Sequence, residues 1–253
     1  KQTIRCSPKE MIFIENNEYN LYKLKNLIDD LSVQKNLDIN FRYLLCSVDN
    51  ESLIANIFKT HKPHIVFHAA AYKHVPLAED NVIQYIQNNV FGTLNVLNNA
   101  IENKVENFLF VSTDKAVRPN NIMGASKRIA ELLLLSKAKN KNSDSIISII
   151  RFGNVLGSIG SVLPLFEEQL TKSNYLTVTH PDVTRYFMSI NEAVGLVLNA
   201  LTISKGGEVF LLNMGKPVKI INLAKKLIKL YGFREKTNEN EDGIEIKFTG
   251  LRP

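Results

Sequence analysis

The chain places an acid and an amine side by side where an apolar run ends. In the segment VSTDKAVRPNNIMGASK, which covers residues 111 to 127, Asp114 is followed directly by Lys115. Opposite charges in a partly dry pocket can be tuned so that one group gives a proton and the other takes one. The pair therefore predicts acid–base chemistry on a bound substrate.

A second pair follows in a helical pattern. Met123 and Lys127 are four residues apart, so they share one face of the predicted helix. Lys127 offers an amine on that face, whereas Met123 has no group that takes up or releases a proton. The residues alone leave two interpretations open: an active site that relies on Asp114 and Lys115, or a degenerate site without activity.

Two further acids close predicted strands. Glu15 ends the apolar run that begins at Met11, and Asp49 follows the run that begins at Phe41. A dinucleotide-binding fold places an acid at the first position against the ribose hydroxyls of the adenosine half. An acid there repels a 2′-phosphate, so Glu15 favours NAD over NADP, although a solvated strand-end carboxylate explains it equally well. Asp49 is expected to face the adenine amino group.

Small residues follow the third predicted strand, in the segment HAAAYKHV. Ala69, Ala70 and Ala71 would let a cofactor lie against the backbone at the carboxyl end of a strand, where doubly wound folds bind ligands. His64 and His68 share a strand face but stand about 13 Å apart, and the sequence shows no cluster of carboxylates or cysteines near them. We therefore expect no metal site.

The glycine-rich turn that opens a dinucleotide-binding fold is not visible. Such a turn leads into a helix whose N-terminal amides hold the pyrophosphate, and residues 1–10 contain no glycine. We expect the sequence to start downstream of this turn and of the first strand, the alternative being a chain that holds the cofactor poorly. A sheet without its first strand would expose an apolar edge.

Short apolar runs alternate with amphipathic stretches, which is the pattern of right-handed βαβ units and a parallel sheet. In the first part of the chain the expected strands cover 11–15, 41–48, 65–71, 108–113 and 145–152, and the expected helices cover 21–31, 53–60, 82–102 and 125–138. A glycine inside a helix costs about 1 kcal/mol relative to Ala, so Gly92 indicates close packing.

The regular alternation of strands and helices changes after Asn154. We expect helices at 162–172, 192–204 and 220–231, strands at 176–179, 208–213 and 244–249, and a mobile polar loop at 234–242. The fold class is therefore α/β, a Rossmann-like doubly wound parallel sheet with a smaller C-terminal lobe. We assign residues 1–155 to a dinucleotide-binding domain and 156–253 mainly to a substrate-binding lobe, with about 185–213 returning to the first domain.

Composition narrows the class of protein. The 253 residues are 45% hydrophobic, enough for a substantial core, and carry a net charge of +6. The lysines are scattered and nucleic-acid-binding motifs are not found, so we expect no nucleic-acid partner. Neither a run of about 18 apolar residues nor a signal peptide is visible. The two cysteines, Cys6 and Cys46, fit a reducing cytosol better than a disulfide framework.

Seven segments together resemble one enzyme family. They are EMIFIENNEYNLYKL, HAAAYKHVPLAEDN, NNVFGTLNVL, VSTDKAVRPNNIMGASKR, RFGNVLGSIGSVLPLFEEQ, HPDVTRYFMSINEAV and FTGLRP, and they cover nearly the whole chain. The chain resembles the UDP-N-acetylglucosamine 4,6-dehydratases of bacterial polysaccharide and glycoprotein-sugar biosynthesis, which are extended short-chain dehydrogenases. It is most similar to the long, membrane-associated form, whose catalytic helix carries Met where these enzymes usually have Tyr.

The resemblance implies a reaction and a role for each residue. Hydride passes from sugar C4 to NAD+, water is lost across C5 and C6, and the hydride returns to C6 to give a 4-keto-6-deoxy sugar. Asp114 is implied as the acid that helps the 6-hydroxyl leave, and Lys115 as the base at C5. Thr113 is implied to hydrogen-bond the 4-hydroxyl, and Lys127 to bind the nicotinamide ribose. With Met123 at the tyrosine position, the group that takes the 4-hydroxyl proton stays open.

Further contacts are also implied by the resemblance. Asn154 is implied to face the diphosphate of the UDP-N-acetylhexosamine, and Arg185 and Arg252 to clamp its phosphates. We also place Lys73 among the substrate-binding residues. Asn89 is placed among the residues that bind the cofactor, which is NAD, with NADP left open.

Two other functions and a partner complete the expectations. A UDP-sugar 4- or 5-epimerase begins with the same hydride abstraction, and a catalytically silent nucleotide-sugar- or NAD-binding protein would explain the absent glycine turn and tyrosine. Short-chain dehydrogenases commonly dimerise through two long helices, here those around Asn89 and Lys127, so we expect a homo-oligomer. The expected location is the cytoplasm, with contact to a membrane only through helices upstream of this sequence.

Overall fold

The computed structural model describes residues 1–139, 144–158, 160–237 and 240–250, and these form two compact units. The larger unit contains Lys1–Arg151 and Gly195–Leu211, and the smaller contains Phe152–Val194 and Leu212–Pro253. The division therefore falls at residue 151, where we predicted 155, and the returning segment is shorter than the predicted 185–213. The functional assignment of each unit remains a prediction.

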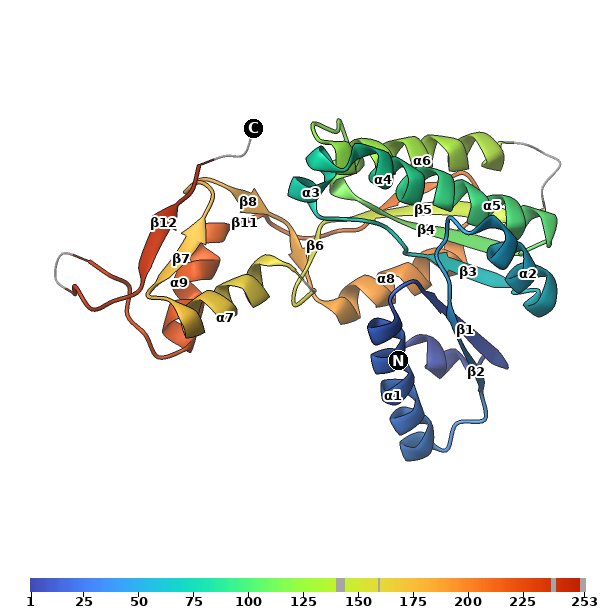
Figure 1. The fold of residues 1–253 in the computed structure, drawn as a ribbon, viewed down its shortest axis with the longest axis horizontal. Helices are drawn as coiled ribbons and strands as arrows, with labels where there is room; N and C mark the ends of the chain where they lie inside the picture. The colour runs from blue at the N-terminus through green and yellow to red at the C-terminus, as the bar shows by residue number, and fades with distance from the viewer. Residues whose placement is uncertain (140–143, 159, 238–239, 251–253) are drawn as a thin grey trace. The chain divides into compact units, whose positions relative to one another are not determined.

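The main sheet of the larger unit has the strand order β10-β5-β4-β3. These strands are β3 (Ile65–His68), β4 (Asn107–Thr113), β5 (Ile146–Phe152) and β10 (Val209–Leu211). Strand β3 pairs with β4, and β5 with β10, in parallel. Figure 1 shows α5 (Gly92–Glu102) and α6 (Ile122–Ala138) along one face of this sheet. Parallel strands end at the same edge, so the residues that follow them are gathered there.

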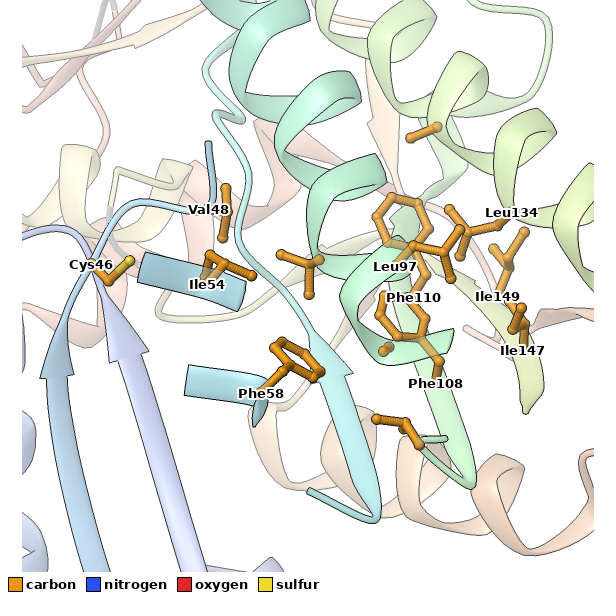
Figure 2. Close-up of a cluster of buried hydrophobic side chains, with 14 residues drawn as sticks. Cys46, Val48, Ile54, Phe58, Leu97, Phe108, Phe110, Leu134, Ile147 and Ile149 are labelled. Atoms are coloured by element: carbon orange, nitrogen blue, oxygen red, sulfur yellow. The ribbon is translucent and has the colours of Figure 1, made fainter. Parts of the chain in front are cut away.

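The core of the larger unit lies between this sheet and its helices (Figure 2). Phe108 and Phe110 on β4 are fully buried, as is Leu134 on α6, and Ile147 on β5 is 1% exposed. Burying one side chain of this size contributes about 1.5–3 kcal/mol. The core therefore fixes α6, which carries Met123 and Lys127, against β4, which ends at Thr113 directly before Asp114 and Lys115.

A second, two-stranded sheet belongs to the same unit. Strands β1 (Glu10–Glu15) and β2 (Asn40–Leu45) pair in parallel, with Glu10 opposite Asn40. Within the described residues, β1 pairs with β2 alone and β3 pairs with β4 alone. Ile65 and Phe67 on β3 remain 43% and 37% exposed. In the described residues β3 is therefore an edge strand that carries two exposed apolar side chains.

Helix α1 (Glu18–Lys35) connects β1 to β2, and α2 (Glu51–His61) follows β2. Both helices begin at asparagine caps. The side chain of Asn17 accepts from the backbone N–H of Asn20 at 3.0 Å, and that of Asn50 from Leu53 at 3.1 Å. Strand β2 ends at Leu45, earlier than predicted. Asp49 therefore lies in the turn before α2 and not at a strand end, because the cap of α2 takes over the local backbone.

The region predicted as one helix over 82–102 is interrupted. It consists of α4 (Val82–Ile86), a π-helical turn η2 (Gln87–Phe91) and α5, and it is preceded by a helix that we did not predict, α3 (Val75–Asp80). A short 3-10 helix, η1 (Thr3–Cys6), was also not predicted. A Cβ on Gly92 would lie 2.7 Å from the Val48 Cγ2 atom, which confirms the predicted close packing at this glycine.

The smaller unit has its own core. Strand β7 (Tyr175–Val178) pairs in parallel with β12 (Glu245–Phe248), and α7 (Val162–Lys172) and α9 (Ile220–Leu230) pack nearby. Phe166, Leu176 and Ile228 are fully buried there. Helix α8 (Ile190–Ile203) contributes residues to both units. The predicted loop at 234–242 contains isolated bridges at Glu235 and Thr237; residues 238–239 lie outside the described residues, and its mobility remains a prediction.

Four two-residue strands of the smaller unit escaped prediction. Strand β6 (Asn154–Val155) pairs in parallel with β9 (Phe187–Met188), and β8 (Thr184–Arg185) pairs in antiparallel fashion with β11 (Val218–Lys219). Two residues are too few to show a hydrophobic period, so only long-range pairing reveals such strands. A helix with the length and apolarity needed to cross a membrane is not found among the described residues.

Candidate active site

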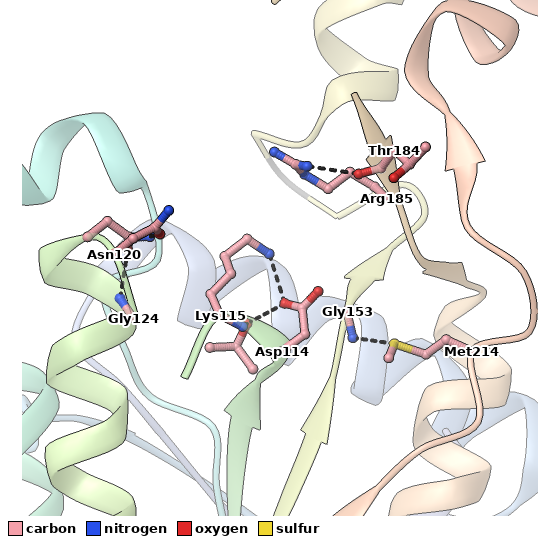
Figure 3. Close-up of polar contacts among 10 residues, drawn as sticks. Asp114, Lys115, Asn120, Gly124, Gly153, Thr184, Arg185 and Met214 are labelled. Carbon is pink, nitrogen blue, oxygen red and sulfur yellow. Dashed lines mark hydrogen bonds and ion pairs between the residues drawn. The ribbon is translucent and has the colours of Figure 1, made fainter. Parts of the chain in front are cut away.

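The acid–amine pair lies on a short turn at the end of β4. Thr113 is the last residue of β4, and Asp114–Ala116 form the 3-10 helix η3. The Lys115 Nζ atom donates to Asp114 Oδ1 at 3.0 Å, and the Thr113 hydroxyl donates to the same oxygen at 3.0 Å. In Figure 3 the Asp114 and Lys115 side chains bend toward each other. The three residues predicted to do the chemistry therefore form one hydrogen-bonded group.

This group is partly desolvated. The side chains of Lys115 and Asp114 are 30% and 25% exposed, which leaves each open enough to meet a substrate. At this burial an ion pair is held more firmly than on a free surface, where it contributes about 0–1 kcal/mol. The hydrogen bond fixes the carboxylate and the amine at defined positions next to each other, and acid–base work requires groups held in place.

Helix α6 approaches this turn closely at a glycine. A Cβ on Gly124 would lie 2.4 Å from the backbone oxygen of Lys115, closer than real Cβ contacts allow. The helix start is fixed by Asn121, whose side chain accepts from the Gly124 N–H at 2.8 Å, and by Glu79, which accepts from the Ile122 N–H at 3.0 Å. Sequence reasoning missed the role of Gly124, because a glycine in a helical segment such as MGASK does not indicate which part of the chain packs against it.

Met123 and Lys127 lie on the same helix, α6, as we predicted, and both are buried. Met123 is 4% exposed and belongs to a cluster with Ala78 and Tyr85. Lys127 is 5% exposed, and its Nζ atom donates to the Val111 backbone oxygen at 2.7 Å. Met123 therefore fills its position with packing and not with a proton acceptor.

The amine of Lys127 is held in an apolar setting. Its Nζ atom lies 3.8 Å from the centre of the Phe110 ring, a cation–π geometry. Burial lowers the pKa of Lys127 to about 7, against the opposing effect of the Glu131 carboxylate. The amine thus sits near the midpoint of its titration at neutral pH.

A pocket opens beside the loop that follows β3. It has a volume of about 480 Å³, within the range of small-molecule sites. It is lined by Ala71, Tyr72, Lys73, His74, Leu77, Asn81, Gln84 and Tyr85. Although Lys73 is exposed as a whole residue, desolvation lowers the pKa of its amine. The pocket therefore brings together one predicted cofactor-binding residue, Ala71, and one predicted substrate-binding residue, Lys73.

The Asn89 side chain holds this loop in place through hydrogen bonds. Its side-chain oxygen accepts from the Tyr72 N–H at 2.8 Å and from Asn88 at 3.0 Å, and its side-chain nitrogen donates to the Tyr72 oxygen and the Ser126 hydroxyl, both at 3.0 Å. These bonds use both donors and both lone pairs of the amide. Asn89 is fully buried and its amide holds the loop at Tyr72; its place among the cofactor-binding residues remains a prediction.

The remaining predicted cofactor residues fit a dinucleotide in their chemistry. The Glu15 Oε1 atom accepts from the Asn17 N–H at 3.0 Å at the end of β1, while Asp49 is exposed. Ala69 and Ala70 are exposed directly after β3, with side chains too small to block an approach to the backbone. Two carboxylates, exposed backbone after β3 and the Lys127 amine together offer the acceptors, the open surface and the donor that a dinucleotide needs, and their individual roles remain predictions.

One of the two histidines considered as metal ligands, His68, has a hydrogen-bond partner within the protein. His68 is 4% exposed, its Nε2 atom lies 2.9 Å from the Thr93 hydroxyl, and burial lowers its pKa to about 3. It is therefore neutral at physiological pH. Within the described part of the chain, a group of three or more His, Cys, Asp or Glu residues arranged to hold a metal is not found.

Two of the predicted phosphate-binding residues, Asn154 and Arg185, lie in the smaller unit. The backbone N–H of Asn154 on β6 donates to the Tyr186 oxygen at 3.0 Å. Arg185 on β8 is exposed, and its Nη1 atom donates to the Thr184 oxygen at 2.8 Å. Arg252 lies outside the described residues. The roles of these three residues remain predictions.

Gly153, which precedes Asn154, is a second close approach that sequence reasoning missed. Its N–H donates to the Met214 sulfur at 2.7 Å, and a Cβ at this position would lie 2.9 Å from that sulfur. Figure 3 shows this contact. The glycine therefore lets the Met214 side chain reach the backbone next to Asn154.

Comparisons with known proteins agree with the fold and the motifs. All of residues 1–253 match the model of a family described as "Polysaccharide biosynthesis protein". The chain is 45% identical over 253 residues to the capsular polysaccharide biosynthesis protein CapD of Staphylococcus aureus, which covers 100% of this chain and 41% of that protein. It is 40% identical over 193 residues to a UDP-glucose 4-epimerase of Rickettsia canadensis, covering 76% of this chain and 54% of the epimerase.

Solved structures are similar over nearly the whole chain, and the structure of Pen is an example. The X-ray structure of Pen from Bacillus thuringiensis has a TM-score of 0.86 and 33% sequence identity, and the match covers 100% of this chain and 72% of that one. The predicted α/β fold of the extended short-chain dehydrogenase type is thereby confirmed. The chain spans about two fifths of the length of CapD and about half that of the epimerase.

Proposed function

The chain belongs to the polysaccharide biosynthesis protein family, and on that premise we propose that it is the catalytic part of a nucleotide-sugar 4,6-dehydratase acting on UDP-N-acetylglucosamine. The observation that carries the proposal is the Asp114–Lys115 pair, held at 3.0 Å on a turn against the helix that carries Lys127. A dehydration needs an acid and a base at neighbouring carbons, and this pair supplies both.

The two groups divide the elimination between them. Lys115 takes the proton from sugar C5, and Asp114 gives a proton to the 6-hydroxyl, which leaves as water while a C5–C6 double bond forms. For this step the aspartate must carry the proton and the lysine must be neutral. Transfer of one proton along the 3.0 Å hydrogen bond produces that state without changing the total charge of the pair. Thr113 hydrogen-bonds the 4-hydroxyl.

The fit of the donor set supports NAD as the cofactor. When bound, the dinucleotide accepts the C4 hydride and later returns it to C6. Lys127 would hold the ribose next to the nicotinamide, and Glu15 the ribose of the adenosine half. Met123 is buried and lacks a proton acceptor, so the proton chemistry rests on the turn at the end of β4.

Substrate recognition is proposed for two separate groups of residues. Lys73 and the pocket that it lines have the size and mixed polarity for part of a nucleotide sugar. In the smaller unit, Arg185 is exposed and offers a planar fork of donors to phosphate oxygens. Asn154 and Arg252 complete the proposed contacts to the diphosphate.

We also propose that the protein forms homo-oligomers and supplies polysaccharide or glycoprotein-sugar synthesis. Phe91 in the π-helical turn is 54% exposed, and Ile129 and Leu132 on α6 are 41% and 50% exposed. Apolar side chains on these two helical segments suit the helix pairing expected for a dimer.

A 4-epimerase is the second candidate, favoured by the 40% identity to a UDP-glucose 4-epimerase. Epimerisation shares the first hydride transfer but returns the hydride to C4. It needs no acid for the 6-hydroxyl, so it leaves Asp114 without a task. The arrangement of the pair therefore favours dehydration.

The test is incubation of the full-length protein with UDP-N-acetylglucosamine and NAD+, followed by mass spectrometry of the sugar nucleotide. We expect a product lighter by one water that reacts as a 4-keto sugar. A product of unchanged mass with an altered C4 configuration would support the epimerase. An unaltered sugar nucleotide would contradict both enzymes and support a binding protein.

A further inference from the structure

A buried carboxylate lies one helical turn beyond Lys127. Glu131 on α6 is fully buried. An ionised carboxylate in a protein interior is costly unless charges and hydrogen bonds compensate it. None of the roles assigned above uses this residue, so its presence in the core calls for an explanation.

The carboxylate of Glu131 is saturated with hydrogen bonds from three elements. Its Oε1 atom accepts from the Ser112 hydroxyl at 2.6 Å and from Arg151 Nε at 2.8 Å. Its Oε2 atom accepts from Arg151 Nη2 at 2.5 Å and from Arg128 Nη1 at 3.0 Å. Four bonds use all the strong acceptor sites of a carboxylate, and the contact with Arg151 is bidentate.

The elements joined by this carboxylate are those that carry the proposed chemistry. Ser112 is on β4, directly before Thr113 and the Asp114–Lys115 turn. Glu131 and Arg128 are on α6 with Lys127. Arg151 is near the end of β5, the next strand of the sheet. One side chain therefore links the strand end that bears the acid and base to the helix that bears the buried amine.

We propose that Glu131 is a positioning residue for the reaction: through Ser112 and Arg151 its carboxylate sets the end of β4 relative to α6, and its charge keeps Lys127 in the form that binds the cofactor ribose. This inference rests on the dehydratase activity proposed above. Stability alone is a weak explanation for this network, because well-packed apolar residues often stabilise a core as well as buried ion pairs do.

The electrostatics of Lys127 support this role. The charged and titratable groups that face the amine are Glu131 on its own helix and His68 on β3. His68 is neutral at physiological pH, since burial lowers its pKa to about 3. Glu131 stays ionised: burial opposes ionisation, but the bonds from Arg151, Ser112 and Arg128 outweigh it and lower the pKa of the carboxyl. Glu131 is thus the negative charge that favours protonated Lys127.

The main test is Glu131→Gln in the full-length protein. The amide keeps the shape of the side chain but replaces one acceptor oxygen with an NH2 group, which sets N–H donors against the donors of Ser112, Arg151 and Arg128. We expect kcat for UDP-N-acetylglucosamine to fall by about 100-fold, as a small misplacement of reacting groups does, with KM nearly unchanged. We also expect the alkaline limb of the pH profile to move to lower pH, because Lys127 loses its proton more easily.

A milder variant and a control guard against misfolding. Ser112→Ala removes only the bond from β4 to Glu131, and we expect kcat to fall by about fivefold, the worth of one hydrogen bond. The control is Glu168→Gln, which changes the same residue type in an exposed ion pair with Lys172 on α7. It should leave kcat, KM and the pH profile as in the wild type.

A readout independent of turnover is hydrogen–deuterium exchange over residues 111–117. Both core variants should exchange faster there, while α7 exchanges as before. Wild-type kcat and pH profile in both variants, or slower turnover explained wholly by a smaller folded fraction, would overturn the proposal. If the wild type leaves UDP-N-acetylglucosamine unaltered, the dehydratase proposal fails instead, and unchanged exchange over 111–117 alone would still refute the positioning role.

Discussion

The turn at the end of β4 and the short strands of the smaller unit hold their proposed functional residues in different ways. Around Asp114 and Lys115 the supporting groups are buried: Lys127 is 5% exposed and Glu131 fully buried. Arg185 instead lies exposed on a two-residue strand, with its guanidinium on a neighbouring backbone oxygen. Groups that move protons have their geometry set in advance, whereas a group that only binds phosphate can be ordered by the ligand.

The difference between the two regions predicts that substitutions in them change different quantities. Changes on the β4–α6 side should act on kcat and on stability, because they disturb preset geometry. Changes at Arg185 should act on KM.

Replacement of Lys115 removes the proposed base. We expect Lys115→Ala to reduce kcat by about 10²–10⁴-fold, the usual contribution of a general base, while the Kd for UDP-N-acetylglucosamine changes little. Steady-state kinetics and calorimetric titration measure the two effects. Lys172→Ala, which removes an exposed lysine on α7, should behave as the wild type. Wild-type turnover in Lys115→Ala would remove the central residue of the proposed mechanism.

The close approach of α6 to the turn can be tested at Gly124. Gly124→Ala places a Cβ 2.4 Å from the Lys115 backbone oxygen, so the turn or the helix must shift. The gain of about 1 kcal/mol in helix propensity is outweighed by overpacking, which costs about 1–3 kcal/mol, and kcat should fall by about 100-fold.

A matched control exists in Gly195 on α8. There a new Cβ would lie 3.7 Å from the Gln2 side-chain oxygen, an ordinary contact. Gly195→Ala should therefore keep full activity and gain a little stability from helix propensity. Equal effects of the two substitutions on kcat and on the urea midpoint would show that the approach at Gly124 is not tight.

Burial of Lys127 predicts a pH dependence of stability. The pKa of this amine is about 7 in the folded chain, against 10.5 ordinarily. Between these values the unfolded chain holds a proton that the folded chain has lost. The contribution of Lys127 to the free energy of unfolding therefore rises with pH in this window, by up to about 1.4 kcal/mol per pH unit.

Urea denaturation of the wild type and Lys127→Met across this window measures that contribution. The variant should lack the part of the slope that Lys127 supplies. An exposed counterpart, Lys172→Met, should keep the wild-type slope. Identical slopes in the wild type and Lys127→Met would mean that Lys127 stays protonated in the folded protein.

The smallest effect is expected for Arg185, the exposed residue of the smaller unit. Arg185→Gln should raise KM for the sugar nucleotide by about tenfold, the value of one charge-assisted hydrogen bond, with kcat and the melting temperature nearly unchanged. Steady-state kinetics and a thermal melt provide the measurements. A fall in kcat at constant KM would place Arg185 with the reacting groups and remove the contrast between the two regions.

Much of the fold was predictable because its signals are local. The alternation of apolar runs and helical patterns placed α7 at its observed bounds and most other elements within a few residues. The break at η2 and the two-residue strands were not predictable. A π-helical turn leaves the composition of a helix unchanged, and a pair of residues shows no period.

Those parts of the site that are neighbours along the chain could be predicted from the residues alone. Adjacency makes Asp114 and Lys115 a pair, and a spacing of four puts Met123 and Lys127 on one helix. The other contacts of the site come from packing in three dimensions. This packing places the Asn89 amide on the Tyr72 backbone and Gly124 against Lys115. The physical reason is that hydrogen bonds and close contacts between distant residues depend on how helices and strands pack, and spacing along one chain does not record that packing.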